Sequence, residues 1–198
     1  TSGRLSLDAS PLKSWLLIGA SVFVFLPLAW FSKENGALLP LFLFVLELTL
    51  FRFAVESRRQ KKGLYLFFTL FLLLPAILAI IYTIQHYGLF HGGYGYGSRQ
   101  FSLIERLLTE PRIIWLYIRM ILLPAPSVYS LFHDDILIST SLFKPITTFI
   151  SIVGLAGLFV LALASIKRAP ILAFGLLFFF AGHLMESTVI PLELAFEH

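Results

Sequence analysis

The stretch LYLFFTLFLLLPAILAIIYTIQHY at residues 64–87 decides the fold class, because it contains no Asp, Glu, Lys or Arg. A transmembrane α-helix needs about 20 consecutive residues that are mainly apolar. A second stretch of this kind, ITTFISIVGLAGLFVLALASI, occupies residues 146–166. Both stretches predict helices that cross a lipid bilayer.

The composition of the whole chain agrees with this prediction. The 198 residues are 58% hydrophobic and 13% charged, and the mean hydropathy is +0.89. A soluble domain carries roughly 25% charged residues. Three further apolar stretches lie at residues 15–31, 37–54 and 171–185. We therefore predict an all-α fold, a polytopic transmembrane helical bundle of five spans, with residues 1–198 forming a single transmembrane domain.

Cationic residues near the ends of the spans predict the orientation, because Lys and Arg gather in short cytoplasmic loops. With a cytoplasmic N-terminus, nine of them lie inside: Arg4, Lys13, Arg52, Arg58, Arg59, Lys61, Lys62, Lys167 and Arg168. Six lie outside: Lys33, Arg99, Arg106, Arg112, Arg119 and Lys144. The outer six are mostly in one long loop, so this orientation is favoured. No basic stripe alternates with aromatic residues, which argues against nucleic-acid binding.

The outer loop, residues 88–145, contains a predicted amphipathic helix that begins with a capping box, Ser102 to Glu105. Its apolar face comprises Phe101, Leu103, Ile104, Leu107 and Leu108. Its polar face comprises Glu105, Arg106, Thr109 and Glu110. We expect it to lie on the membrane surface with the polar face in water. Pro111 should open a second helix over residues 113–123, so that the loop holds a re-entrant or interfacial helical pair.

Two groups of basic residues are candidates for binding an anionic headgroup. Lys33 and Glu34 lie in the turn after the first stretch, where Lys33 either snorkels toward water or meets a lipid-linked phosphate. Four arginines recur along the outer loop, and a guanidinium binds phosphate through a planar fork of donors. They are Arg99, Arg106, Arg112 and Arg119. For Arg106 we favour a pair with a neighbouring acid on a wet surface. For Arg119, inside an apolar stretch, we favour a functional role.

Acidic residues and histidines gather in two other places. His133, Asp134 and Asp135 could hold a divalent metal ion through oxygen ligands, act as a general base, or form a plain solvated loop. The second group lies at and beyond the end of the fifth stretch: His183, Glu186, Glu193, Glu197 and His198. Acids at the outer edge of a span favour an interaction site. Glu47, inside the second stretch, is expected to pair with Arg52 or to snorkel toward it.

Four separated motifs carry a resemblance that covers nearly the whole chain. They are SKENGALLP at 32–40, ERLLTEPR at 105–112, LFHDD at 131–135, and ESTVIPLEL at 186–194 running into FEH at 196–198. In this order they resemble bacterial polytopic proteins with C-terminal tetratricopeptide repeats. Those proteins are similar to the eukaryotic transmembrane and tetratricopeptide-repeat O-mannosyltransferases of the GT-C glycosyltransferase superfamily.

The resemblance implies an enzyme of the bacterial inner membrane that takes a sugar from a polyprenyl-phosphate donor. It passes the sugar to an extracytoplasmic acceptor, with protein among the candidates. The catalytic acid of such enzymes lies in their first outer loop, which would precede Thr1, so the catalytic residue here is unknown and this piece alone is expected to be inactive. Related enzymes place a Lys near the donor phosphate, at the position of Lys33. The candidate donor-phosphate or substrate-binding residues are Lys33, Glu34, Glu110, Arg112, Arg119, His133, Asp134, Asp135, Glu186, Glu193 and His198.

Two other functions remain open from the residues alone. One is a non-enzymatic membrane scaffold or lipid-binding subunit, in which the arginines hold anionic headgroups. The other is a transporter, which the few charges at membrane depth and the lack of an inverted-repeat pattern of broken spans disfavour. Membrane lipids are expected partners in every case, and a divalent metal ion is the one cofactor that the residues would allow.

Overall fold

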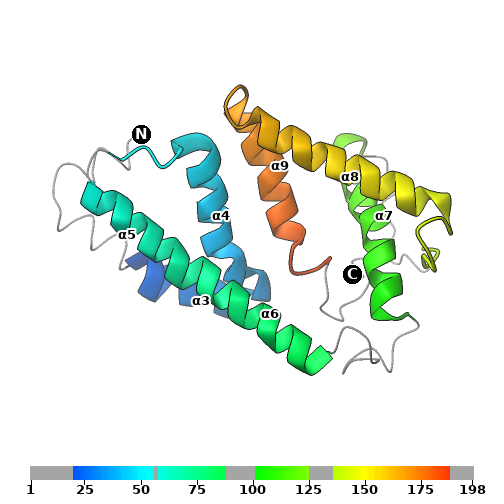
Figure 1. Cartoon of the computed structure of the whole chain (residues 1–198), viewed down its shortest axis with the longest axis horizontal. Helices are drawn as coiled ribbons and strands as arrows, with labels where there is room; N and C mark the ends of the chain where they lie inside the picture. The colour runs from blue at the N-terminus through cyan, green and yellow to red at the C-terminus, as the bar shows by residue number, and fades with distance from the viewer. Residues whose placement is uncertain (1–19, 56–57, 88–100, 125–135, 188–198) are drawn as a thin grey trace. The chain divides into compact units, whose positions relative to one another are not determined.

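The computed structural model describes residues 20–55, 58–87, 101–124 and 136–187 (Figure 1). Over these ranges the chain is mostly helical, and its β-structure is limited to one isolated bridge, Ser141 to Lys144. The predicted all-α class is confirmed for this part of the chain. The chain divides into two compact units, Thr1–Leu43 and Phe44–His198.

The first unit is organised around a tight turn between two short helices. After the π-turn η1 (Ser21–Phe25), helix α3 covers Leu26–Ser32 and the 3-10 helix η2 covers Glu34–Leu38. Lys33 joins them in an extended conformation, and its carbonyl accepts the Gly36 N–H at 2.8 Å. A Cβ at Gly36 would overlap the backbone carbonyl of Ala29. Only glycine therefore allows η2 to pack this closely on α3.

Helix α4 (Leu39–Leu46) continues into the π-turn η3 (Glu47–Phe51). The helix ends there because Arg52 and Phe53 have φ angles of 56° and 52°, in the left-handed region. The next helix is one rod built from α5 (Arg58–Phe68), η4 (Thr69–Leu73) and α6 (Leu74–Tyr87). Pro75 has no N–H to donate to the carbonyl four residues earlier, as a residue within an α-helix does. The π-turn η4 lies just before Pro75, where the regular α-helical bonding is interrupted.

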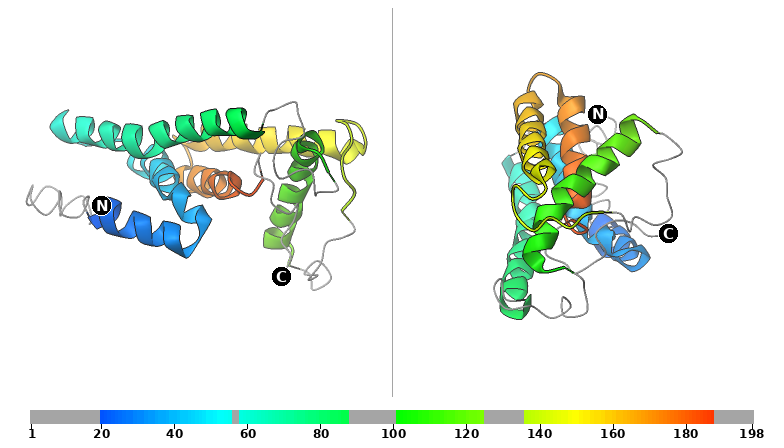
Figure 2. Two further views of the ribbon diagram at one scale, coloured as in Figure 1. Left: turned by 90° about the horizontal axis from the view of Figure 1, so that it is seen from below. Right: turned by 90° about the vertical axis from the view of Figure 1, so that its right-hand side faces the viewer.

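Three helices complete the second unit: α7 (Leu103–Leu122), α8 (Ile146–Ser165) and α9 (Pro170–His183). Helices α8 and α9 form a hairpin, and their contact is lined by small residues, with Ala162 and Ala173 both 0% exposed. Helix α7 packs against α8 (Figure 2). The ring of Trp115 on α7 lies against Gly154 on α8. Helix α7 therefore packs on α8 at this position.

The expected pair of helices around Pro111 is a single helix, which corrects the prediction from the sequence. Helix α7 runs through Pro111 without interruption. A proline inside a helix removes one backbone hydrogen bond. Side chains on both sides of Pro111, those of Thr109 and Arg112, bond to the segment before α8 and hold the helix on that neighbour. These bonds outside the helix compensate for the missing one.

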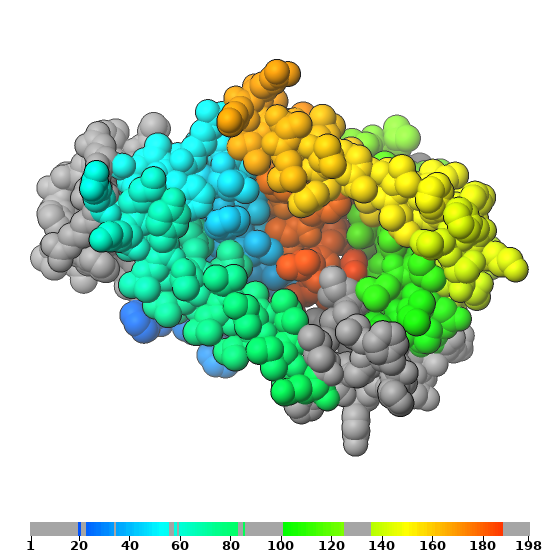
Figure 3. Space-filling view, in the orientation of Figure 1, coloured from blue at the N-terminus to red at the C-terminus, as the bar shows by residue number. Residues whose placement is uncertain are grey.

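Two helices, Gln60–Tyr82 and Ile146–Ser165, are long and apolar enough to cross a membrane. Only 6% and 22% of their most apolar windows are buried, so most of their apolar side chains face outward, as those of α8 do in the space-filling view (Figure 3). A helix from the core of a soluble protein would be mostly buried. Three shorter apolar helices, Phe23–Ser32, Asn35–Phe51 and Pro170–His183, overlap the other three predicted spans but are not long enough to count as spans by themselves, so the bundle of five spans stays a prediction.

Candidate functional site

Helix α7 begins at the predicted capping box. The Ser102 side chain accepts the backbone N–H of Glu105 at 3.3 Å, and Glu105 Oε2 accepts the backbone N–H of Ser102 at 2.8 Å. Two N–H groups that would lack partners at a helix start are thus satisfied. The capping box fixes where α7 starts and therefore which of its residues share a face.

The polar face of α7 is buried in the protein, which corrects the expectation that it faces water. Arg106 and Thr109 are 0% exposed and Glu110 is 2% exposed. On the opposite face Ile104 is 59% exposed and Leu107 is 41% exposed. Polar groups are buried at low cost only when they find partners, and these three do. The amphipathic pattern was correct, but the helix turns its apolar side outward.

A buried ion pair joins α7 to the segment that follows α9. Arg106 Nη2 lies 2.8 Å from Glu110 Oε1, one helical turn away, and donates to the backbone carbonyl of Glu186 at 2.5 Å. Glu110 Oε1 is in contact with the guanidinium but accepts no hydrogen bond within the described residues, so this contact is chiefly electrostatic. Ser187 donates a hydrogen bond to the same carboxylate.

Burial changes the protonation of Glu110. Desolvation raises the pKa of Glu110 from 4.5 to about 7, although the charge of Arg106 and the Ser187 hydrogen bond lower it. The negative charge of Glu186 contributes a further, smaller rise. Glu110 thus exchanges its proton near neutral pH, as groups used for acid–base chemistry often do.

A second buried network connects α7 to the start of α8. Thr109 Oγ1 donates to the Glu105 carbonyl at 2.7 Å and accepts the Ser139 N–H at 2.8 Å. The Ser139 hydroxyl lies 2.7 Å from the Thr148 hydroxyl, and both residues are 0% exposed. The segment before α8 is therefore held against α7 by bonds of well-defined geometry.

Arg112 extends this network toward the surface. Its Nη1 donates to the Leu137 carbonyl at 2.6 Å and to the Ser139 hydroxyl at 3.3 Å. Both bonds use the same nitrogen, and Nε and Nη2 donate to no residue that the structure describes. Partial burial lowers the pKa of Arg112 from its ordinary value, but a guanidinium remains charged at neutral pH. Arg112 is thus held in place by one nitrogen, while the other two have no acceptor within the described ranges.

Aromatic contacts align the end of α9 with the middle of α7. The His183 ring stacks on Tyr117 with a centroid distance of 5.2 Å and an interplanar angle of 12°. Phe179 contacts the same imidazole at 4.5 Å. Trp115 Nε1 donates to the Ser151 carbonyl of α8 at 3.0 Å. Helix α7 therefore contacts both members of the α8–α9 hairpin.

The other predicted site residues are either outside the α7 helix face described above or outside the described ranges. Lys33 is exposed, and Glu34 begins η2, both in the first unit. Arg119 is exposed on α7, and its functional role stays a prediction. The predicted residues outside the described ranges are His133, Asp134, Asp135, Glu193 and His198. Within the described residues, no three His, Asp or Glu side chains are grouped to hold a metal ion.

Ser139, Thr148 and Ser187 are members of the buried networks that sequence reasoning missed. No spacing pattern singles out these three residues, because their role depends on partners from distant segments. Arg52 was misassigned in part. Its guanidinium donates to the Ile166 and Lys167 carbonyls at 3.0 Å, and only its backbone N–H bonds to Glu47, at the carbonyl.

In the part of the chain that the structure describes, these features define an all-α fold with two helices able to cross a membrane and a buried polar cluster on α7. We call this cluster, formed by Arg106, Thr109, Glu110, Ser139, Thr148, Glu186 and Ser187, the α7 cluster. No family model, curated protein or solved structure matches the chain. Its function is therefore inferred from its residues and their contacts.

Proposed function

We propose that this chain is part of a membrane glycosyltransferase, which transfers a sugar from a polyprenyl-phosphate donor to an extracytoplasmic acceptor such as a protein. The contact between Arg106, Glu110 and Glu186 carries the proposal. It joins two of the four motifs on which the resemblance rests, 105–112 and 186–194, although they are far apart in the sequence. Motifs that build one substrate site must meet in space.

Arg112 supports the proposal through donor nitrogens that bond to no described residue. A lipid-linked phosphate is monoanionic or dianionic, and a guanidinium binds it best through two nitrogens at once. Arg112 is anchored through Nη1, and among the described residues nothing accepts from its Nε and Nη2. Its anchor, Leu137 to Ser139, follows shortly after the third motif, His133-Asp134-Asp135. We assign Arg112 to the donor phosphate; Lys33, in the first unit, is proposed for it on the resemblance alone.

The proposal includes five spans in the bacterial inner membrane and a cytoplasmic N-terminus. The bonds from Arg52 to the Ile166 and Lys167 carbonyls support it, because they hold the end of the second span beside the end of the fourth. Charge counting assigns both ends to the cytoplasm. The α7 cluster would then lie near the opposite surface, where the acceptor is found.

The test is sugar transfer from a polyprenyl-phosphate donor by the full-length protein that contains this chain. Lys33→Ala and Arg112→Ala should each weaken donor binding about ten- to a hundredfold, because each removes a charge-assisted contact. Arg112→Lys should restore little, since an ammonium lacks the planar fork. Arg58→Ala serves as the control and should leave transfer unchanged. Wild-type transfer by the two alanine variants, together with weaker binding of plain anionic lipid, would favour the scaffold function instead.

A further inference from the structure

A left-handed turn after η3 brings three basic segments of the second unit together. Arg52, in the left-handed region, donates from Nη2 to the Ile166 and Lys167 carbonyls at 3.0 Å each. These carbonyls lie at the C-terminal end of α8, where the last carbonyls of a helix lack N–H donors from the same helix and favour a cation. The charge of Arg52 is thus placed directly beside Lys167 and Arg168.

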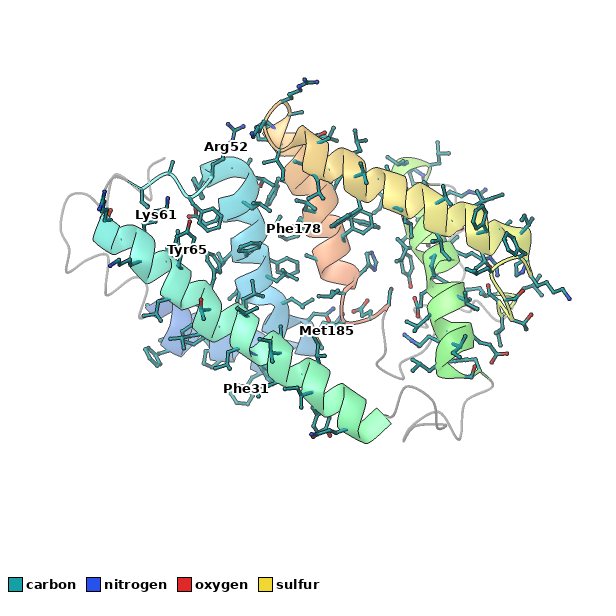
Figure 4. The ribbon with its side chains drawn as sticks, viewed as in Figure 1. Phe31, Arg52, Lys61, Tyr65, Phe178 and Met185 are labelled. Atoms are coloured by element: carbon teal, nitrogen blue, oxygen red, sulfur yellow. The ribbon has the colours of Figure 1, made fainter. Side chains whose placement is uncertain are left out.

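Phe53, the next residue, connects the same turn to α5. Its ring stacks on Tyr65 with a centroid distance of 5.7 Å and an interplanar angle of 28°. The ammonium of Lys61 lies 5.9 Å from the centroid of the Tyr65 ring. Figure 4 labels Arg52, Lys61 and Tyr65, which lie at the same end of this unit. The turn at Arg52 and Phe53 therefore contacts both α5 and the basic loop between α8 and α9.

We propose that these segments form a binding surface for the headgroups of anionic phospholipids, which we call the basic surface. Its exposed cations are Arg52, Arg58, Lys61, Lys62, Lys167 and Arg168. Charge complementarity favours an anionic partner. The three basic segments lie within residues 44–62 and 165–170, which together hold seven Lys and Arg but only two Glu. This surface is distinct from the α7 cluster and does not depend on transferase activity.

The position of the basic surface favours a membrane over a soluble anion. It lies at the N-terminal end of the helix Gln60–Tyr82 and at the C-terminal end of α8, the two helices able to cross a bilayer. Where such helices leave the apolar layer, basic and aromatic side chains meet lipid headgroups. The rings of Phe44, Phe53, Tyr65 and Phe68 form a cluster, and Tyr65 of this cluster lies under the ammonium of Lys61. Binding of a soluble anion would not require aromatic rings beside the cations, whereas binding at a membrane interface does favour them.

The test uses the whole chain, reconstituted into nanodiscs of phosphatidylcholine with a minor fraction of phosphatidylglycerol. The measured quantity is the enrichment of phosphatidylglycerol among the lipids that remain bound after extraction with neutral detergent. We expect enrichment in the wild type and a loss of about fivefold per cation in Lys61→Ala/Lys62→Ala and in Lys167→Ala/Arg168→Ala. Lys61→Arg/Lys62→Arg should keep the enrichment, because it keeps the charge.

The matched control is Lys144→Ala, at the opposite end of α8 from Lys167, which should leave the enrichment unchanged. Circular dichroism and thermal unfolding in neutral detergent establish that each variant is folded. The proposal is wrong if folded variants of the basic surface keep full enrichment, or if Lys144→Ala loses as much. It is also wrong if inorganic phosphate displaces the lipid at equal concentration, because the site would then be one for a free anion.

Discussion

Arg106 and Glu110 form an ion pair at 2.8 Å whose two side chains are 0% and 3% exposed. Such a pair adds little net stability, because removing both charges from water costs about as much as their attraction returns. Its function is specificity, since Arg106 also donates to the Glu186 carbonyl and so defines where the segment after α9 lies on α7. Breaking one partner should therefore have a larger effect than removing both.

The first prediction concerns this pair. Arg106→Leu should lower the free energy of unfolding by about 3 kcal/mol, because Glu110 is left buried without its counterion. The loss lies at the low end for such pairs because Glu110 can take up a proton. Arg106→Leu/Glu110→Leu should recover most of it. Thermal unfolding in neutral detergent measures the difference, and a double variant less stable than either single variant would contradict the role assigned to the pair.

The second prediction is a pH dependence that originates at Glu110. Its pKa is about 7 in the folded protein and 4.5 ordinarily, so the folded state binds more protons between these values. The free energy of unfolding should therefore fall as the pH rises from about 4.5 to 7, by about 3 kcal/mol for a shift of this size. Glu110→Gln should remove this fall, because the amide does not titrate. Unfolding measured across this pH range in both proteins tests it, and equal slopes would show that Glu110 is not the group responsible.

The third prediction compares two glycines on α8. A Cβ at Gly154 would lie 2.7 Å from Cζ2 of Trp115, whereas a Cβ at Gly157 would meet nothing within 4 Å. Gly154→Ala should destabilise the protein by about 1–3 kcal/mol, since the indole must move and its bond to Ser151 is strained. Gly157→Ala should be neutral or slightly stabilising in the same helix. Thermal unfolding of the two variants is the measurement, and equal unfolding temperatures would exclude close packing of α7 on α8.

The fourth prediction tests the orientation through the two ends of α8. The chain contains no cysteine, so Lys144→Cys and Lys167→Cys each introduce a single thiol at an exposed position. A membrane-impermeant thiol reagent should label Lys144→Cys in intact cells and Lys167→Cys only after the membrane is opened. The opposite pattern would reverse the proposed topology, and labelling of both from outside would show that α8 does not cross the membrane.

Two helices and one helix start were correctly predicted, because each depends on neighbours in the sequence. They are the helices over the apolar runs 64–87 and 146–166 and the capping box at Ser102. A run of apolar residues forms a helix, and a capping box satisfies its own backbone, wherever the helix is later placed. The pattern on α7 was also local, so the positions of its polar and apolar faces could be predicted. The sequence could not predict which of the two faces of α7 would be buried in the protein and which would be exposed.

Tertiary structure alone decided the environment of Arg106, Glu110 and Arg52. A polar face suits water or an interior that offers partners, and periodicity is the same in both cases. The partners of Arg106 and Arg52 are backbone carbonyls at Glu186, Ile166 and Lys167. Every residue has such a carbonyl, so no side-chain pattern marks the ones that will be used. The sequence by itself determined which helices form and which faces are polar, whereas long-range packing determined that the polar face of α7 is buried.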